Sequence, residues 1–379
     1  MIFTLELKLG IAGTAKNTGK TTVTAAVMNE LRRRGVPFYL TSIGYDGENI
    51  DNVTGLPKPK LPVETGDVVA TAEKCLLAST ARFAVLAETA VRTPLGKVKV
   101  VRVTEPGLVV TAGPNKSSEV QAITEILSKL GPGITLVDGA LNRIVPMSET
   151  DCFILATGAA RSLDIPRLAK ETECIRRIAD LPLAPHSSAI RSQNLNNVSL
   201  LDDTGILLAA TSYTSLLSEK DAAVTLNEAA KTNAACLYVP GIISERAMHF
   251  MLSAKHRRYL PRFLAVPNPI KLLAFGNAIE YLEDLEHLAA AGMSTGVVRR
   301  IPMLAVTVNP FYPEFRYESA SYQPAYIDPL RLYLTMKATV SAPAYNIMRQ
   351  GVDELIELIL SSQKTWNSPQ MIQMAASVI

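Results

Sequence analysis

The sequence is poor in the residues that build metal clusters and disulfide frameworks. Its 379 residues include four cysteines, four histidines and one tryptophan. The cysteines lie far apart in the sequence and form no CxxC pair, which indicates structural thiols in a reducing compartment rather than a disulfide scaffold. The histidines form no HExxH-type cluster. These absences argue against a zinc enzyme.

The chain also lacks a strong charge imbalance and a long apolar run. A formal net charge of +3 over 379 residues is too small to predict a nucleic-acid or membrane surface. No apolar run approaches the roughly 18 residues of a membrane span, and the opening "MIFTLELKLGIAG" does not resemble a signal peptide. Because hydrophobic residues make up 48% of the chain, we expect a large core, a cytoplasmic location and room for two domains.

Short apolar runs alternate with amphipathic runs along the chain. Several apolar runs, such as "GITLVDGA" and "DCFILATGA", are hydrophobic almost throughout, as parallel strands buried on both faces are. The expected strands cover residues 7–13, 37–44, 108–113, 133–140, 151–159, 235–242, 263–267 and 303–309. The expected helices are Thr22–Arg34, Ser118–Leu130, Ile165–Ala179, Asp221–Lys231 and Glu245–Leu252. This alternation predicts an α/β fold with a doubly wound, mostly parallel sheet.

Two proline-rich stretches predict long inserted loops, and the sequence marks no sharp domain boundary. The loops are expected at Asp46–Asp67 and Asn309–Pro329, and the last helix at Ala344–Ser361. We expect one α/β region over residues 1–340, with a division near 144–149 left open, and a C-terminal helix and tail over 341–379.

The stretch "GIAGTAKNTGKTTVTAAVMNELRRRG", residues 10–35, carries the strongest functional signal. A strand leads into a glycine-containing turn with "GKTT", and an amphipathic helix follows. In a P-loop (Walker A motif), small residues let backbone N–H groups surround phosphate oxygens, and the helix adds its positive N-terminal end. The expected nucleotide-binding residues are Gly13, Thr14, Lys16, Asn17, Thr18, Gly19, Lys20, Thr21 and Thr22.

The P-loop assignment gives two of these residues distinct roles. Lys20 would meet the β- and γ-phosphates, and Thr21 would bind Mg²⁺. The motif departs from G-x-x-x-x-G-K-[ST], because five residues separate Gly13 from Gly19 and Thr14 stands where the first glycine is expected.

Acidic residues at two expected strand ends are candidates for the magnesium side of the site. In "GITLVDGALNR" Asp138 ends a buried strand, where a carboxylate can hold Mg²⁺ and orient the attacking group. In "TSIGYDGEN" Asp46 follows another strand and is the second candidate. Lys20 and Asp138 are therefore the expected catalytic pair and Thr21, Asp46 and Asp138 the expected metal ligands. The sequence leaves open which carboxylate is the main one.

A further turn, "AGPNKSSEV", offers two readings. Backbone N–H groups after Gly113 and the side chain of Lys116 can bind an anion. Ser117 or Ser118 can equally be explained as the cap of the following helix.

The loop resembles those of two P-loop families. "GTAKNTGKTT" is similar to the loop of dethiobiotin synthetase, which also has a leading Gly-Thr and five intervening residues, and "KNTGKTT" resembles the loop of molybdopterin-guanine dinucleotide accessory proteins. The first resemblance implies a P-loop NTPase fold and implies that Asn309, just past a late strand, reads the base. No N-K-x-D guanine signature is present, which favours ATP over GTP.

A wider resemblance concerns the reactivase subunit of lysine 5,6-aminomutase. It is carried by "TSIGYDGENIDNVTGLPKPK", "VATAEKCL", "LVDGALNR" and "SAPAYNIMRQG". It implies a protein of lysine fermentation that uses Mg-ATP to exchange damaged cofactor in an adenosylcobalamin-dependent aminomutase. It also implies a second ATPase subunit as partner, in a homodimer or hetero-oligomer. The chain lacks the D-x-H-x-x-G cobalamin motif, so it need not bind the cofactor itself.

The competing function is a small-molecule ligase or kinase of dethiobiotin-synthetase type. The same loop would serve it, because in both cases the loop stabilises charge on the transferred phosphoryl group. The two functions differ in whether the remaining cleft holds a small acceptor or a protein.

Overall fold

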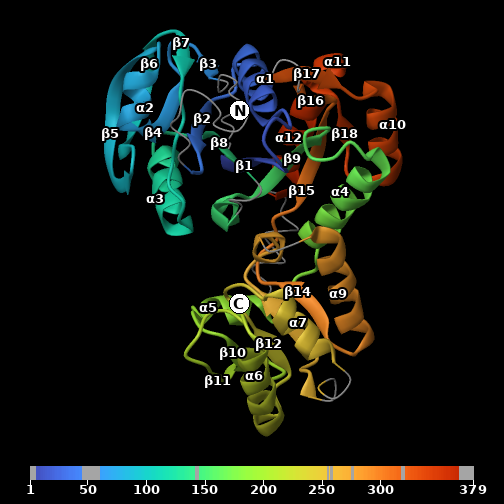
Figure 1. Cartoon of the computed structure of the whole chain (residues 1–379). Coiled ribbons are helices and arrows are strands. Elements are labelled where there is room, and N and C mark those ends of the chain that lie inside the picture. Colours follow the sequence, from blue (N-terminus) through green and yellow to red (C-terminus); the bar gives the residue numbers. More distant parts are fainter. Residues whose placement is uncertain are drawn as a thin grey trace. The chain divides into compact units, whose positions relative to one another are not determined.

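The chain forms two compact units (Figure 1). The computed structural model describes residues 6–44, 60–140, 145–253, 256, 259–274, 277–316 and 321–366. Unit 1 comprises residues 1–169 and 303–379, and unit 2 comprises residues 170–302. Unit 2 is thus an insertion into unit 1, and neither junction coincides with the division near 144–149 that the sequence left open.

Unit 1 is built on a nine-stranded mixed sheet. Its order is β18 (Ala344–Tyr345), β15 (Met303–Asn309), β9 (Cys152–Gly158), β1 (Glu6–Gly13), β8 (Gly133–Ala140), β2 (Phe38–Ser42), β4 (Val68–Ala72), β6 (Gly96–Glu105) and β5 (Arg82–Thr93). The seven strands from β18 to β4 are parallel, and β6 and β5 add an antiparallel hairpin at one edge. The α/β class expected from the sequence is confirmed.

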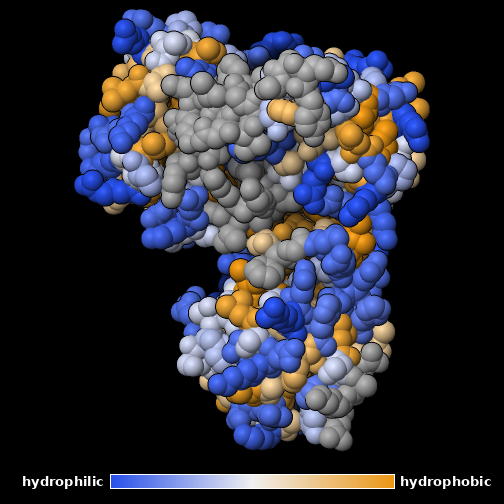
Figure 2. All heavy atoms as spheres, viewed as in Figure 1, coloured by the Kyte–Doolittle hydropathy of each residue, from blue (hydrophilic) through white to orange (hydrophobic). Residues whose placement is uncertain are grey.

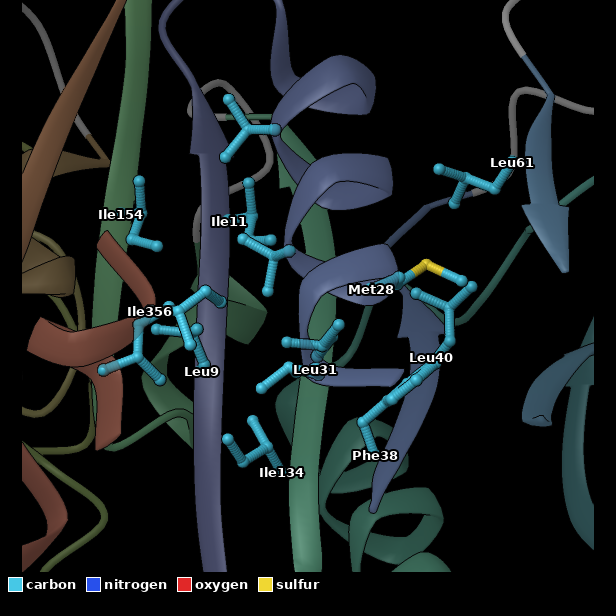
Figure 3. Packing of buried hydrophobic residues seen from close by; sticks show 14 of the residues in the cluster. Leu9, Ile11, Met28, Leu31, Phe38, Leu40, Leu61, Ile134, Ile154 and Ile356 are labelled. Atoms are coloured by element: carbon cyan, nitrogen blue, oxygen red, sulfur yellow. The ribbon is translucent and has the colours of Figure 1, made fainter. Parts of the chain in front are cut away.

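Helices pack on both faces of this sheet. Side chains of one parity, including Leu9, Leu40 and Ile134, pack with α1 (Lys20–Arg33) and α12 (Asp353–Trp366) (Figure 3). Side chains of the other parity, such as Tyr39, pack with α3 (Ser117–Ser128). Strand residues alternate between faces, so nearly continuous apolar runs fill both layers. The face that carries α1 matters most for the candidate site, because α1 begins beyond the carboxyl end of β1.

Smaller elements complete unit 1. They are α2 (Glu73–Ala78), the pair β3 (Leu61–Val63) and β7 (Gly107–Val109), the 3₁₀ helix η2 (Val145–Glu149), the pair β16 (Phe311–Arg316) and β17 (Ser321–Tyr326), α10 (Pro329–Thr339) and α11 (Ile347–Gln350). Hydrophobic surface seen in Figure 2 includes part of α10, where Leu330 and Leu334 are 54% and 52% exposed. Within the described residues, no helix is long and apolar enough to cross a membrane.

Unit 2 has a separate five-stranded sheet. Its order is β11 (Leu207–Ala210), β10 (Ser199–Leu201), β12 (Cys236–Tyr238), β13 (Phe263–Val266) and β14 (Ser294–Val297), of which the last three are parallel. Its helices are α5 (Ser187–Ser192), α6 (Glu219–Thr232), α7 (Glu245–Leu252), α8 (Ile270–Leu273) and α9 (Ala278–Ala290), and α4 (Ile165–Ala179) spans the junction. The expected strands 235–242 and 263–267 therefore belong to a second sheet rather than to the main one.

Two secondary-structure predictions near the C-terminal end are wrong. The stretch Asn309–Pro329, expected as a loop, contains the antiparallel β16–β17 pair, with Pro313 opposite Pro324. Each strand of this two-stranded sheet is an edge strand. Proline is tolerated there, because the outer side of an edge strand forms no backbone hydrogen bonds within the sheet. The helix expected at Ala344–Ser361 is divided into β18, α11 and α12, and Gly351, with a φ of 76°, stands between the two helices.

An ionic network joins the end of α1 to α12 and predicts acid sensitivity. Glu30, whose side chain is 8% exposed, accepts hydrogen bonds from Arg33 and Arg34, and these bonds lower its pKa to about 2. Both arginines also approach Asp353 of α12 at 3.3 Å. Because the folded pKa is depressed, the stabilisation is complete above the ordinary carboxyl pKa of about 4.5 and is lost as the pH falls towards 2.

We expect Glu30→Gln to flatten the loss of stability between pH 4.5 and pH 2. The measurement is the denaturation midpoint of both proteins as a function of pH. Since the variant has no carboxylate to protonate at this position, its midpoint should fall less steeply than that of the wild type. Parallel curves for the two proteins would contradict the role given to Glu30.

Candidate functional site

The strand order creates a topological switch point at the carboxyl ends of β1, β8 and β9, where open α/β sheets form a ligand-binding crevice. After β1, the chain passes through α1 and returns to the sheet as β2, which lies on the far side of β8. After β8, the chain returns as β9, which lies on the opposite side of β1. Successive connections thus diverge at β1. In open α/β sheets, ligands bind at the carboxyl end of such a switch point.

The loop between β1 and α1 lies at this crevice and has an unusual backbone. Asn17 and Gly19 have φ values of 63° and 90°, in the left-handed region. A side chain at Gly19 would be strained there and would also place a Cβ 3.3 Å from Cβ of Asn309. At Gly13 an added Cβ would lie 3.0 Å from Thr18 Oγ1. A side chain at Gly13 would therefore crowd Thr18, and one at Gly19 would crowd Asn309 and strain the backbone.

The start of α1 is suited to an anion. Gly19 is the N-cap residue, no side chain caps the helix, and its first turn has no acidic residue. The N-terminal end of the helix dipole therefore meets no negative side chain within the helix. This is the arrangement in which helix N-termini bind phosphate.

Neighbouring strands hold the loop in place. Thr14 donates from its backbone N–H to Ala156 O at 3.0 Å and from its hydroxyl to Thr157 Oγ1 at 2.9 Å. Within the loop, Thr18 Oγ1 donates to Ala15 O at 2.9 Å. The threonine at the position of the usual first glycine thus ties the loop to β9. Thr157 is a contributor that the sequence analysis missed.

Lys20 and Asp138 form an ion pair beneath the loop. Lys20 Nζ lies 2.5 Å from Asp138 Oδ1, and the two side chains are 25% and 7% exposed. Lys20 is the first residue of α1, and Asp138 lies near the end of β8, where it is in register with Ile11 of β1. The two residues named as the catalytic pair are thereby brought together from positions 118 residues apart.

The remaining predicted loop residues surround this pair. Thr21 is half-buried at the first turn of α1, and Thr22 and Lys16 are exposed. Asp46 lies outside the described residues, so the second carboxylate candidate stays a prediction. Within the described residues, no three His, Cys, Asp or Glu side chains gather into a metal cluster. A magnesium ion at Asp138 would accordingly need Thr21, water and phosphate oxygens, a ligand set that Mg²⁺ commonly has.

Asn309 lies at the end of β15, on the other side of β1 from Asp138. Its amide Nδ2 donates to Asn17 O at 2.9 Å, and its Oδ1 accepts from Phe311 N at 3.2 Å. A small pocket opens beside it, lined by Thr18, Gly19, Thr22, Val23, Thr307, Val308, Asn309, Ile347 and Met348. Thr307 Oγ1 is buried and has no hydrogen-bond partner within the described part of the chain. Asn309 therefore fixes the loop and borders a pocket with an unused polar group.

In the turn after β7, helix capping was one of the two readings that the sequence left open, and α3 does not have such a cap. The N-cap position of α3 is Lys116, and no side chain caps the helix. Instead, Ser117 Oγ lies 3.0 Å from Ser148 Oγ of η2. The serine is engaged with a neighbouring segment, because the helix begins one residue earlier than expected.

Comparisons of the chain with protein-family models, with curated proteins and with solved structures gave no match.

Proposed function

We propose that this chain is a Mg²⁺-dependent P-loop ATPase. The observation that supports the proposal most strongly is the Lys20–Asp138 pair at the uncapped start of α1, at the switch point of a parallel sheet. A lysine, a helix N-terminus and a buried carboxylate at one edge supply a cation for phosphate and an oxygen ligand for a divalent ion.

We propose that the Lys20–Asp138 ion pair opens when a nucleotide binds. The terminal phosphates would draw the Lys20 ammonium away from Asp138, since they carry more negative charge than one carboxylate. Asp138, only 7% exposed, would then need another cation beside it. Mg²⁺, held by Asp138 and Thr21 together with the phosphates, would neutralise charge on the transferring group.

The pocket beside Asn309 is the proposed site of the base. It adjoins Gly19, and its lining combines apolar side chains with the free Thr307 hydroxyl. Such pockets orient a ring with a few polar groups. The absence of a guanine signature makes adenine the proposed base.

Asn309→Ala should weaken ATP binding about tenfold, because it removes the amide that holds Asn17 and one wall of the pocket. The measurement is equilibrium binding of ATP and of inorganic triphosphate. We expect the loss with both ligands to be similar if Asn309 acts through the loop, and larger with ATP if it also contacts the base. Unchanged binding of both would contradict the placement of the nucleotide.

The proposed biological role is that of a reactivase for an adenosylcobalamin-dependent aminomutase, in which ATP hydrolysis drives exchange of damaged cofactor. This part rests on the sequence resemblance. The test is phosphate release from ATP by the purified chain, alone and with a mutase carrying inactivated cobalamin. Lys20→Ala and intact mutase are the controls.

The result separates the two functional classes. Stimulation by the damaged mutase above the level seen with intact mutase is expected for a reactivase. Hydrolysis without stimulation would contradict the reactivase role and favour the ligase or kinase, for which carboxylate and amine acceptors would then be screened. Absence of any phosphate release would contradict the ATPase proposal itself.

A further inference from the structure

Ser42 lies beside Asp138 on the face of the sheet that carries α1. It is the last residue of β2 and is in register with Asp138 of β8, which is in turn in register with Ile11 of β1. Residues in register on parallel strands present their side chains to the same face. Leu40, two residues earlier in β2, packs in the core beneath α1. The Ser42 side chain therefore continues this face at its carboxyl end.

The backbone around Ser42 is closely held. Ile43 N donates to Asp138 O at 2.7 Å, and Gly113 N donates to Gly44 O at 2.9 Å. A Cβ at Gly113 would lie only 1.7 Å from Ser42 O, so the turn after β7 packs directly on this residue. Ser42 is thus fixed by β8 on one side and by the Gly113 turn on another.

The Ser42 hydroxyl is buried and unused. The residue is 5% exposed, and its Oγ has no hydrogen-bond partner among the residues that the structure describes. Buried hydroxyls are nearly always paired, because an unpaired one costs free energy relative to water. The adjacent Asp138 carboxylate is bonded to Lys20. The Ser42 hydroxyl is therefore a second polar group at this edge of the sheet, and it is available to bind a ligand.

The order of the strands says which part of a nucleotide Ser42 would meet. The base pocket lies at β15, the loop follows β1, Asp138 is on β8 and Ser42 is on β2. Neighbouring strands are about 4.8 Å apart, so these features succeed one another along the sheet edge. Ser42 lies beyond Asp138, on the side farthest from the base.

We propose that Ser42 is a binding residue for the Mg²⁺-bound terminal phosphate. Its hydroxyl donates a hydrogen bond to an oxygen of that phosphate once Lys20 has moved from Asp138 to the nucleotide. This inference rests on the proposed ATPase function. It makes Ser42 a sensor of the third phosphate, which would be the part of the nucleotide nearest to β2.

The test compares Ser42→Ala with Thr295→Val. Thr295 is a control in the sheet of unit 2, where its hydroxyl is also buried and without a partner. The measurements are the melting temperature without nucleotide, the dissociation constants for Mg·ATP and Mg·ADP, and the rate of ATP hydrolysis. Neither variant should melt below the wild type, since each loses an unsatisfied hydroxyl rather than a hydrogen bond.

We expect Ser42→Ala to bind Mg·ATP about tenfold more weakly and to hydrolyse it about tenfold more slowly, with binding of Mg·ADP unchanged. Thr295→Val should match the wild type in all nucleotide measurements. Equal affinities of Ser42→Ala and wild type for Mg·ATP, or equal losses for ATP and ADP, would overturn the proposal while leaving the ATPase function intact. A wild-type protein that binds neither nucleotide would instead overturn the ATPase function.

Discussion

Lys20→Ala should reduce ATP hydrolysis by about a thousandfold, to the level of the buffer. The ammonium is the charge that the start of α1 delivers to the crevice, and removing a preorganised group that stabilises transition-state charge typically costs about 10²–10³ in rate. The measurement is phosphate release under saturating Mg·ATP. Hydrolysis that survives the substitution would show that the loop is not the catalytic P-loop.

The same substitution should also destabilise the empty protein. Without Lys20, the Asp138 carboxylate stays buried with its Oδ1 unpaired, which should lower the free energy of unfolding by about 1–3 kcal/mol. The double variant Lys20→Ala with Asp138→Asn separates the two effects. It removes the unpaired buried charge that lowers stability, but it does not restore the ammonium that catalysis needs. It should recover stability and remain inactive.

Asp138→Asn is expected to lower hydrolysis by a few hundredfold, about 10²–10³, while ATP still binds in the absence of magnesium. The amide keeps the shape of the carboxylate but is a poorer ligand for Mg²⁺ and carries no charge. The measurement is the rate as a function of Mg²⁺ concentration, which should no longer saturate in the range of the wild type. An unchanged magnesium dependence would remove Asp138 from the metal site.

Asp67→Asn is a matched control for this variant. Asp67 has a similarly buried carboxylate, 8% exposed, and its Oδ2 lies 2.7 Å from Arg32 Nη2. It precedes β4 and therefore lies at the amino edge of the sheet, away from the crevice. We expect Asp67→Asn to lose stability but to keep its rate of hydrolysis. A lower rate in Asp138→Asn alone would then show that the effect comes from the proposed site and not from the loss of a buried carboxylate.

The sequence predicted the local secondary structure around the candidate site well. The apolar run before Gly13, the small residues that follow it and the amphipathic spacing of Val23, Val27 and Leu31 are all encoded within one stretch. The sequence also predicted that Asp138 lies near the end of a buried strand, and β8 has it there. Local composition therefore suffices where a strand, a turn and a helix are contiguous.

The parts that sequence reasoning missed depend on contacts between distant segments. Nothing in residues 235–267 says that their strands pair with each other and not with β1, because apolar parallel strands look alike in any sheet. β16 and β17 each contain one proline among their aromatic residues, and these prolines hid the hairpin. Ser42 and Thr307 have no sequence signal at all. Their importance comes from burial without a partner.

The most direct test of the central claim is a calorimetric titration of the purified chain with Mg·ATP. We predict saturable binding with one nucleotide per chain, weakened in both Lys20→Ala and Asn309→Ala, since both residues border the proposed site. Absence of binding to the wild type, or binding of equal strength in all three proteins, would show that the loop between β1 and α1 does not hold a nucleotide.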